Sequence, residues 1–189
     1  MKAISKSSLI VALFLIFSVA LKSQDDKFLT AAANGDLSKV NSFIKKGGDV
    51  NTKNNLKWTA LSYAAKFGHL DVVKVLIENG ANINYKNNTG FTPVVIAFLN
   101  NQESIFKYLI EKGADVNIKD MVGMSVLAYA VKENKLNAVK YLVEQGKANV
   151  NIKNSSGRTP MDVCTNDEIS KYLRANGAKT GKELMSGTE

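Results

Sequence analysis

The chain is poor in the residues that build catalytic and metal sites. Among its 189 residues there is one histidine, His69, and one cysteine, Cys164. One cysteine cannot form a disulfide within the chain, and these two residues do not provide the spaced ligand clusters of a zinc site. No nucleophile is paired with a base, and the glycines form no phosphate-binding loop. The sequence therefore predicts a non-enzymatic protein with no catalytic residue, no metal and no cofactor.

A strong excess of one charge is also missing, because the chain is only mildly basic. The chain has 25 basic and 17 acidic side chains. Residues 1–23 contain Lys2, Lys6 and Lys22 and no acid, so the remainder keeps 22 basic side chains against 17 acidic ones. That balance is not typical of a dedicated nucleic-acid-binding protein. We therefore expect no nucleic-acid partner.

The N-terminus has the order of residues found in secretory signal peptides. Lys2 and Lys6 precede an apolar centre at residues 9–17. Small residues follow at Ser18 and Ala20, and the chain then turns polar. A basic start, an apolar centre and small residues at the cleavage site are the three parts of such a signal.

Two cleavage sites fit this signal, after Ala20 and after Ser23. An uncleaved membrane anchor is the alternative, but the uncharged run at residues 7–21 is shorter than the roughly 20 apolar residues of a spanning helix. We take residues 1–23 as the signal peptide. The predicted localisation is periplasmic or secreted, with no contact with a membrane after cleavage.

One glycine-led phrase recurs along the rest of the chain. It reads GGDVN, GANIN, GADVN and, with one lysine inserted, GKANVN. The phrases begin at glycines spaced by 33 residues, namely Gly47, Gly80, Gly113 and Gly146. A fixed period of this size is typical of stacked repeat proteins. The predicted repeat domain covers residues 24–179 and is followed by a flexible tail at 180–189. Its units lie at about 26–53, 54–86, 87–119, 120–153 and 154–179.

Each unit is predicted to contain a turn and two short helices. Asn, Asp and Gly open the unit and provide the backbone conformations that tight turns require. The second helix carries apolar residues at helical spacing, as at Leu70, Val73 and Leu76. A glycine such as Gly80 then ends this helix. Two short helices cannot bury an apolar face alone, so the units must stack on one another.

These residues carry a family resemblance. Thr92-Pro93-Val94 and Thr159-Pro160-Met161 resemble the TPLH opening of the ankyrin repeat. Residues 64–69 (AAKFGH) resemble its AAxxGH centre, and residues 80–84 (GANIN) its GADVN close. The resemblance covers residues 26–179. It implies an all-α ankyrin-repeat solenoid of three full repeats with degenerate capping repeats at both ends.

The chain departs from the family pattern at a few positions. The extra Lys147 predicts that the fourth unit stacks less regularly. His69 occupies the GH position, where the resemblance implies a structural role, and Cys164 is expected to be a buried, inert thiol. No unit has the histidine of TPLH, and four other residues stand in its place: Ser62, Val95, Ala128 and Asp162.

The resemblance implies that the turns project as fingers and form a concave face with the first helices, where such proteins bind partners. One finger position is occupied through the stack by Trp58, Phe91, Met124 and Arg158. Large apolar groups are typical of interface centres, although these side chains could instead fold back and pack between neighbouring fingers. Further candidates for the same face are Leu56, Met121, Val122, Phe67 and Leu99.

A lysine column forms a second candidate for partner binding. Four lysines share one register at the base of successive fingers: Lys53, Lys86, Lys119 and Lys153. Aligned positive charges would attract an acidic partner, although lysine here could simply solvate the turn. Asparagines such as Asn117 are expected to bond the turn backbone. Lys107 and Glu111 have the i,i+4 spacing of an ion pair on the second helix.

The sequence thus predicts a monomeric interaction module that binds another protein, one with an acidic patch, through its concave finger and inner-helix face. Three specific roles remain open at this point. The chain could be an immunity or inhibitor protein against a toxin or enzyme, an accessory factor of a periplasmic enzyme, or a host-directed effector. The first two rest on analogy with exported relatives.

Overall fold

The computed structural model describes residues 24–186, so the predicted signal peptide lies outside the described residues. Within residues 24–186, no helix combines the length and the apolarity needed to span a bilayer. The same residues form no strand, and the one isolated bridge joins Lys53 to Thr59. The all-α prediction is therefore confirmed.

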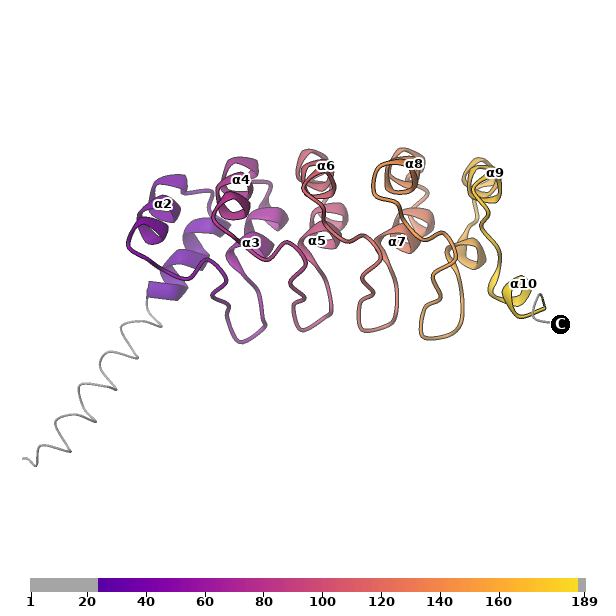
Figure 1. Ribbon diagram of the computed structural model, residues 1–189, viewed down its shortest axis with the longest axis horizontal. Helices are drawn as coiled ribbons and strands as arrows, with labels where there is room; N and C mark the ends of the chain where they lie inside the picture. The colour runs from indigo at the N-terminus through magenta and orange to yellow at the C-terminus, as the bar shows by residue number, and fades with distance from the viewer. Residues whose placement is uncertain (1–23, 187–189) are drawn as a thin grey trace, which may run out of the picture.

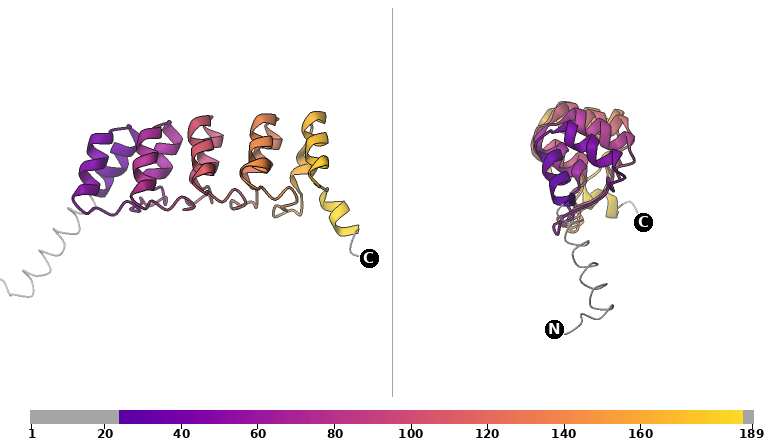
Figure 2. Two further views of the ribbon diagram at one scale, coloured as in Figure 1. Left: turned by 45° about the horizontal axis from the view of Figure 1, so that its top comes forward. Right: turned by 90° about the vertical axis from the view of Figure 1, so that its left-hand side faces the viewer.

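The helices stand in two rows, and long loops project from one side of the stack (Figure 1). The outer row holds α2 (Leu37–Lys45), α4 (Leu70–Glu78), α6 (Glu103–Glu111), α8 (Leu136–Glu144) and α9 (Asp167–Ala175). The inner row holds the helix at residues 24–33, α3 (Ala60–Phe67), α5 (Pro93–Leu99), α7 (Val126–Lys132) and the 3-10 helix η1 (Pro160–Val163). A last helix, α10 (Gly181–Ser186), follows at the C-terminal end. Figure 2 shows the loops of successive units running along one edge of the molecule.

The apolar core is continuous from one unit to the next. Leu61 of α3, Leu127 of α7 and Leu173 of α9 are all fully buried. Burying a leucine side chain contributes about 1.5 to 3 kcal/mol, whereas a helix of seven to nine residues is unstable alone. Stacking therefore stabilises these helices, as the solenoid prediction requires. At the N-terminal end the stack begins with the rings of Phe28 and Phe43, whose centroids lie 4.0 Å apart.

Asparagine side chains connect each unit to the next. The Oδ1 atom of Asn117 accepts a hydrogen bond from the backbone N–H of Asn149 at 2.7 Å, and its Nδ2 donates to the Lys147 carbonyl at 3.4 Å. This confirms that these asparagines bond backbone, and it shows that the backbone belongs to the following unit. We call this set the asparagine ladder. Its other members are Asn51 with Asn82 and Gly80, Asn84 with Asp115, and Asn151 with Lys179 and Gly177.

The inserted Lys147 disturbs the stack less than the sequence predicted. Lys147 adopts the left-handed conformation, with φ 52°, that Gly80 and Gly113 adopt in the preceding units. Gly146 is needed for a different reason, because a Cβ atom there would lie 2.8 Å from the Leu142 carbonyl oxygen. One turn thus absorbs the extra residue, and the asparagine ladder continues past it.

The C-terminal tail is more ordered than the sequence predicted. Residues 181–186 form α10, and the buried Gly181 donates its N–H to Oδ2 of Asp162 at 2.7 Å. Nη1 of Arg174 lies 2.7 Å from Oε2 of Glu183. The last three residues are outside the described part of the chain. Because helical segments close both ends, residues 24–186 form a stack with capped end units, as repeat proteins require.

The asparagine ladder leads to a stability prediction. We expect Asn117→Ala to lower the free energy of unfolding by about 1 to 2 kcal/mol, because two hydrogen bonds between units are lost. Urea denaturation followed by circular dichroism measures this change. Asn55→Ala is the matched control, since this exposed asparagine takes no part in the ladder. Equal stability of the two variants would contradict the role of the ladder.

The C-terminal helix leads to a pH prediction. Hydrogen bonds from the Arg174 guanidinium and then from Thr180 lower the pKa of Glu183 to about 2, from an ordinary value of 4.5. A depressed pKa means that the carboxylate stabilises the docked helix above pH 4.5 and that this contribution is lost as the pH falls towards 2. The protection of the α10 amides from hydrogen exchange, measured relative to the intrinsic exchange rate at each pH, should therefore fall over that range. In Glu183→Gln this protection should already be low at pH 7, and strong protection in that variant would exclude the mechanism.

Candidate protein-binding face

Each finger turn is held by the side chain of its first residue. In the second unit, Oδ1 of Asn54 accepts hydrogen bonds from the backbone N–H groups of Leu56 at 2.9 Å and Trp58 at 3.0 Å. The same two bonds form in the other fingers at Asn87, Asp120 and Asn154. This Asx-type bonding fixes the turn without any partner. The fingers are therefore preformed.

The predicted finger stripe is mostly folded back onto the inner helices. Trp58 is half-buried, with its ring centroid 5.2 Å from that of Tyr63. Phe91 is also half-buried and packs edge-on against Tyr129 at 6.0 Å. Met124 is half-buried, whereas Arg158 is exposed and donates to the Asp162 carbonyl at 2.7 Å. Trp58 and Phe91 therefore fold back and pack, as the alternative interpretation expected, although both keep part of their surface in solvent.

The most exposed apolar candidates lie elsewhere on the same face. Leu56, Met121 and Val122 at the finger tips are 60, 74 and 58% exposed. Phe67, at the end of α3, is 47% exposed, and Leu99 is half-buried. The structure therefore separates the candidates into tips that face solvent and side chains that pack beneath them.

An aromatic cluster with one cation lies on the second unit. We define the α3 platform as Trp58, Tyr63, Lys66 and Phe67. The rings of Tyr63 and Phe67 are parallel, with centroids 6.5 Å apart. Nζ of Lys66 lies 5.4 Å from the Trp58 ring and 5.1 Å from the Phe67 ring. Cation–π contacts of this kind hold the ammonium group in place while it stays charged.

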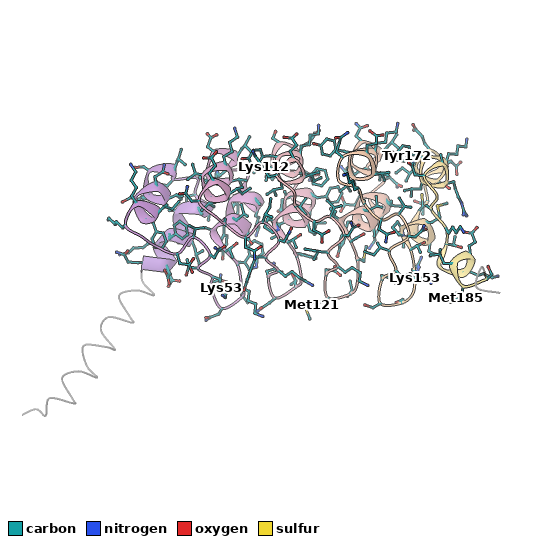
Figure 3. All side chains as sticks on the ribbon, in the orientation of Figure 1. Lys53, Lys112, Met121, Lys153, Tyr172 and Met185 are labelled. Carbon is teal, nitrogen blue, oxygen red and sulfur yellow. The ribbon has the colours of Figure 1, made fainter. Side chains whose placement is uncertain are left out.

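The lysine column contributes to the stack. Nζ of Lys86 donates to the Lys119 carbonyl at 2.8 Å, and Nζ of Lys119 donates to the Lys153 carbonyl at 3.2 Å. Nζ of Lys53 reaches the next unit differently, lying 5.4 Å from the centre of the Tyr85 ring. Each of these three lysines thus contacts the following unit. Lys53, Lys86 and Lys119 remain exposed, and Lys153 is half-buried. Figure 3 labels Lys53 and Lys153 at the two ends of the column.

Positive charge is concentrated on the fingers and inner helices of the second to fifth units. Eight basic residues lie at 51–67, 84–99, 117–132 and 151–163, against two acidic ones, Asp120 and Asp162. Neither acid is free. Asp120 accepts two turn N–H groups and the Tyr129 hydroxyl. Burial and this bond to Asp120 raise the pKa of Tyr129. Burial alone would raise the pKa of Asp162, but the N–H groups of Thr159 and Gly181 and the Thr159 hydroxyl hold it below its ordinary value. These four stretches are therefore basic, and the two acids within them are bonded inside the fold.

The third unit differs from its neighbours in polarity. Within the described residues, two buried side-chain atoms have no hydrogen-bond partner, Nδ2 of Asn87 and Oγ1 of Thr92. Tyr63 supplies the partner of Asn54 in the second unit, but Ile96 occupies the equivalent place here. Ser62 likewise bonds Thr59, whereas Val95 stands opposite Thr92. The apolar residues of α5 thus remove two polar partners.

The lone histidine has a structural contact, as the sequence predicted. Its Nε2 lies 2.9 Å from the Ala33 carbonyl, and its ring lies against Gly35, where a Cβ atom would come within 2.5 Å. The Cys164 thiol is half-buried, not buried as expected, and it donates to the Asn166 carbonyl at 3.3 Å. No three residues of the metal-binding types lie close enough to hold an ion within residues 24–186.

A groove of about 560 Å³ lies where the third and fourth units meet, next to the loops that join their helices. The groove is related to the residue that precedes the outer helix, which is His69, Gln102 and Lys135 in three successive units. His69 bonds the Ala33 carbonyl and Gln102 bonds the Lys66 carbonyl, so both side chains bridge the gap to the unit before. Lys135 holds this position in the fourth unit and lines the groove.

Tyrosines on the outer helices were missed by the sequence reasoning. The predicted Lys107–Glu111 pair does not form, because Nζ of Lys107 lies 2.6 Å from Glu103 instead. Glu111 accepts the hydroxyl of Tyr141 from the next unit at 3.1 Å. Burial and this hydrogen bond raise the pKa of Tyr141. Tyr172 bonds Glu144 in the same way at 3.0 Å. The recurrence of tyrosine at one position of the outer helices was the sequence pattern that could have predicted these bonds.

Comparison with known proteins agrees with this architecture. The fold is a stack of paired short helices with projecting fingers, the class of helical repeat proteins. The family model for ankyrin repeats matches residues 28–120 and 121–183, which is most of the chain. The protein therefore belongs to the ankyrin-repeat family, whose members typically bind other proteins and are typically non-enzymatic. A search of curated proteins finds no match.

The unpaired amide in the third unit gives a prediction. We expect Ile96→Tyr to increase the free energy of unfolding by about 1 kcal/mol relative to Ile96→Phe, because the added hydroxyl can accept from Nδ2 of Asn87 as Tyr63 does from Asn54. The phenylalanine variant controls for ring size. Chemical denaturation of both variants measures the difference, and equal stabilities would show that the hydroxyl does not reach the amide.

Proposed function

We propose that this protein is a non-enzymatic, monomeric binding module that acts outside the cytoplasm. Its partner is another protein that presents an acidic surface to the inner-helix face. The observation that carries the proposal is the charge distribution. In the second to fifth units, residues 51–67, 84–99, 117–132 and 151–163 of the fingers and inner helices contain eight basic side chains, and the two acids among them are bonded internally. The extracytoplasmic location is inferred from the sequence pattern of residues 1–23.

The α3 platform is the proposed anchor for the partner. Trp58, Tyr63 and Phe67 provide aromatic surface, and partly exposed aromatic groups beside a cation are typical of interface hot spots. Lys66 is already held by two rings, so little side-chain entropy is lost when it meets a carboxylate. Lys132 repeats this basic position two units along the stack and is exposed. A partner with carboxylates at both places would therefore be favoured.

The test uses charge reversal at the half-buried Lys66 and the exposed Lys132. The partner is first captured by the immobilised chain from an envelope fraction, then identified, purified and measured by calorimetry. We expect Lys66→Glu with Lys132→Glu to weaken binding by at least tenfold, because attraction between opposite charges becomes repulsion. Phe67→Ser should weaken binding further by removing an exposed ring.

The matched control reverses two charges on the outer helices, Lys74→Glu and Lys171→Glu. These changes alter net charge equally and lie away from the proposed face. If both double variants weaken binding to the same extent, the inner-helix face is not the site. Separately, recovery of the native chain from the cytoplasmic fraction would contradict the proposed location.

A further inference from the structure

The finger tips carry apolar side chains that the fold does not use. Leu56, Met121 and Val122 are more than half exposed. The neighbouring tips are polar, with Asn88 and Thr89 in the third unit and serines in the fifth. The Asx-type bonding is the same under apolar and polar tips, so the large side chains are not needed to form the turn. Their exposure therefore indicates contact with another molecule.

The tips are held in a row by backbone hydrogen bonds between fingers. The N–H of Asn88 donates to the Leu56 carbonyl at 3.1 Å, and the N–H of Met121 donates to the Thr89 carbonyl at 3.3 Å. The N–H of Ser155 continues the series to the Val122 carbonyl at 3.1 Å. The fingers consequently end along one edge in Figure 1 and in the left view of Figure 2. Figure 3 shows Met121 on this edge, with the 67% exposed Met185 of α10 along the same side.

Positive charge accompanies the row. Lys57 is exposed beside Leu56, and the lysine column runs behind the tips on every finger. The acidic residue next to Met121, Asp120, turns its carboxylate inward to two N–H groups and to Tyr129. Apolar groups at a tip with basic groups behind them match the layers of an anionic membrane surface, in which acyl chains lie beneath phosphate groups.

We infer that the tip row, defined as Leu56, Lys57, Met121 and Val122, docks the protein on the surface of an anionic lipid membrane. The apolar tips enter the boundary between headgroups and acyl chains, and the lysines meet the phosphates. This revises the expectation of no membrane contact after cleavage, which rested on removal of the signal peptide. A surface-bound protein needs no spanning segment.

The spacing of the tips favours lipid over a protein partner. Leu56 and the Met121–Val122 pair are two units apart, roughly 20 Å if neighbouring helices pack 8–10 Å apart, and a polar finger lies between them. A protein interface places its hot spots in one packed centre. A bilayer surface needs no such centre, because lipids close around each isolated apolar group. A straight edge also suits a flat surface.

The experiment measures sedimentation of the chain from residue 24 onward, which contains both end caps, with vesicles of phosphatidylcholine containing 30% phosphatidylglycerol. Circular dichroism first verifies that each protein is folded. We expect binding that is at least tenfold weaker on pure phosphatidylcholine and that declines as salt is raised. Leu56→Ser, Met121→Ser and Val122→Ser together should weaken it at least tenfold. Phe67→Ser, an exposed apolar residue away from the tips, should leave it unchanged.

Three outcomes would overturn the inference. One is unchanged sedimentation of the triple variant, and another is an equal loss in Phe67→Ser. The third is that the native chain does not bind anionic vesicles, while the triple variant no longer binds the purified protein partner. That result would assign the tips to a protein interface. Vesicle binding is measured without that partner, so a failure of the proposed protein-binding function would be distinguishable.

Discussion

The rest of the structure depends on the hydrogen bonds that the ladder asparagines make to the next unit. An asparagine side chain has one acceptor and one donor group, and Asn51, Asn117 and Asn151 use both on backbone of the following unit. Apolar stacking alone would allow neighbouring helices to slide, because the hydrophobic effect has no direction. The ladder sets the register, so the fingers line up and their side chains form rows.

Polarity in the inner row changes from unit to unit. Tyr63 and Tyr129 bond the first residue of their own finger, and Asp162 bonds Thr159 and the start of α10. The third unit has Val95 and Ile96 in these positions and leaves two buried polar atoms without partners. A buried unpaired group costs about 1 to 3 kcal/mol. The inner helix at the centre of the stack, α5, therefore carries no polar side chain, and the finger of that unit is the least satisfied.

Much of the fold could be predicted from the sequence, because the period fixes which residues are equivalent. The units, the capped ends and the structural role of His69 follow from that equivalence. The helix at residues 181–186 could not be predicted, since α10 is anchored by Asp162, nineteen positions before Gly181. The Lys107–Glu111 pair was wrong for a similar reason. Spacing within one helix says nothing of Tyr141, which reaches Glu111 from the next unit.

The candidate site was less predictable, because one register is compatible with both packing and binding. Trp58 and Phe91 do both in part, since they pack on tyrosines and keep some exposed surface. The lysine column shows that one side chain can both stabilise the stack and be available to bind a partner. A lysine that donates to a carbonyl in the next unit, as Lys86 and Lys119 do, uses a hydrogen bond and keeps its full charge. The same contacts that align the fingers therefore hold positive charges in a row. A basic face follows directly from the way this stack is joined.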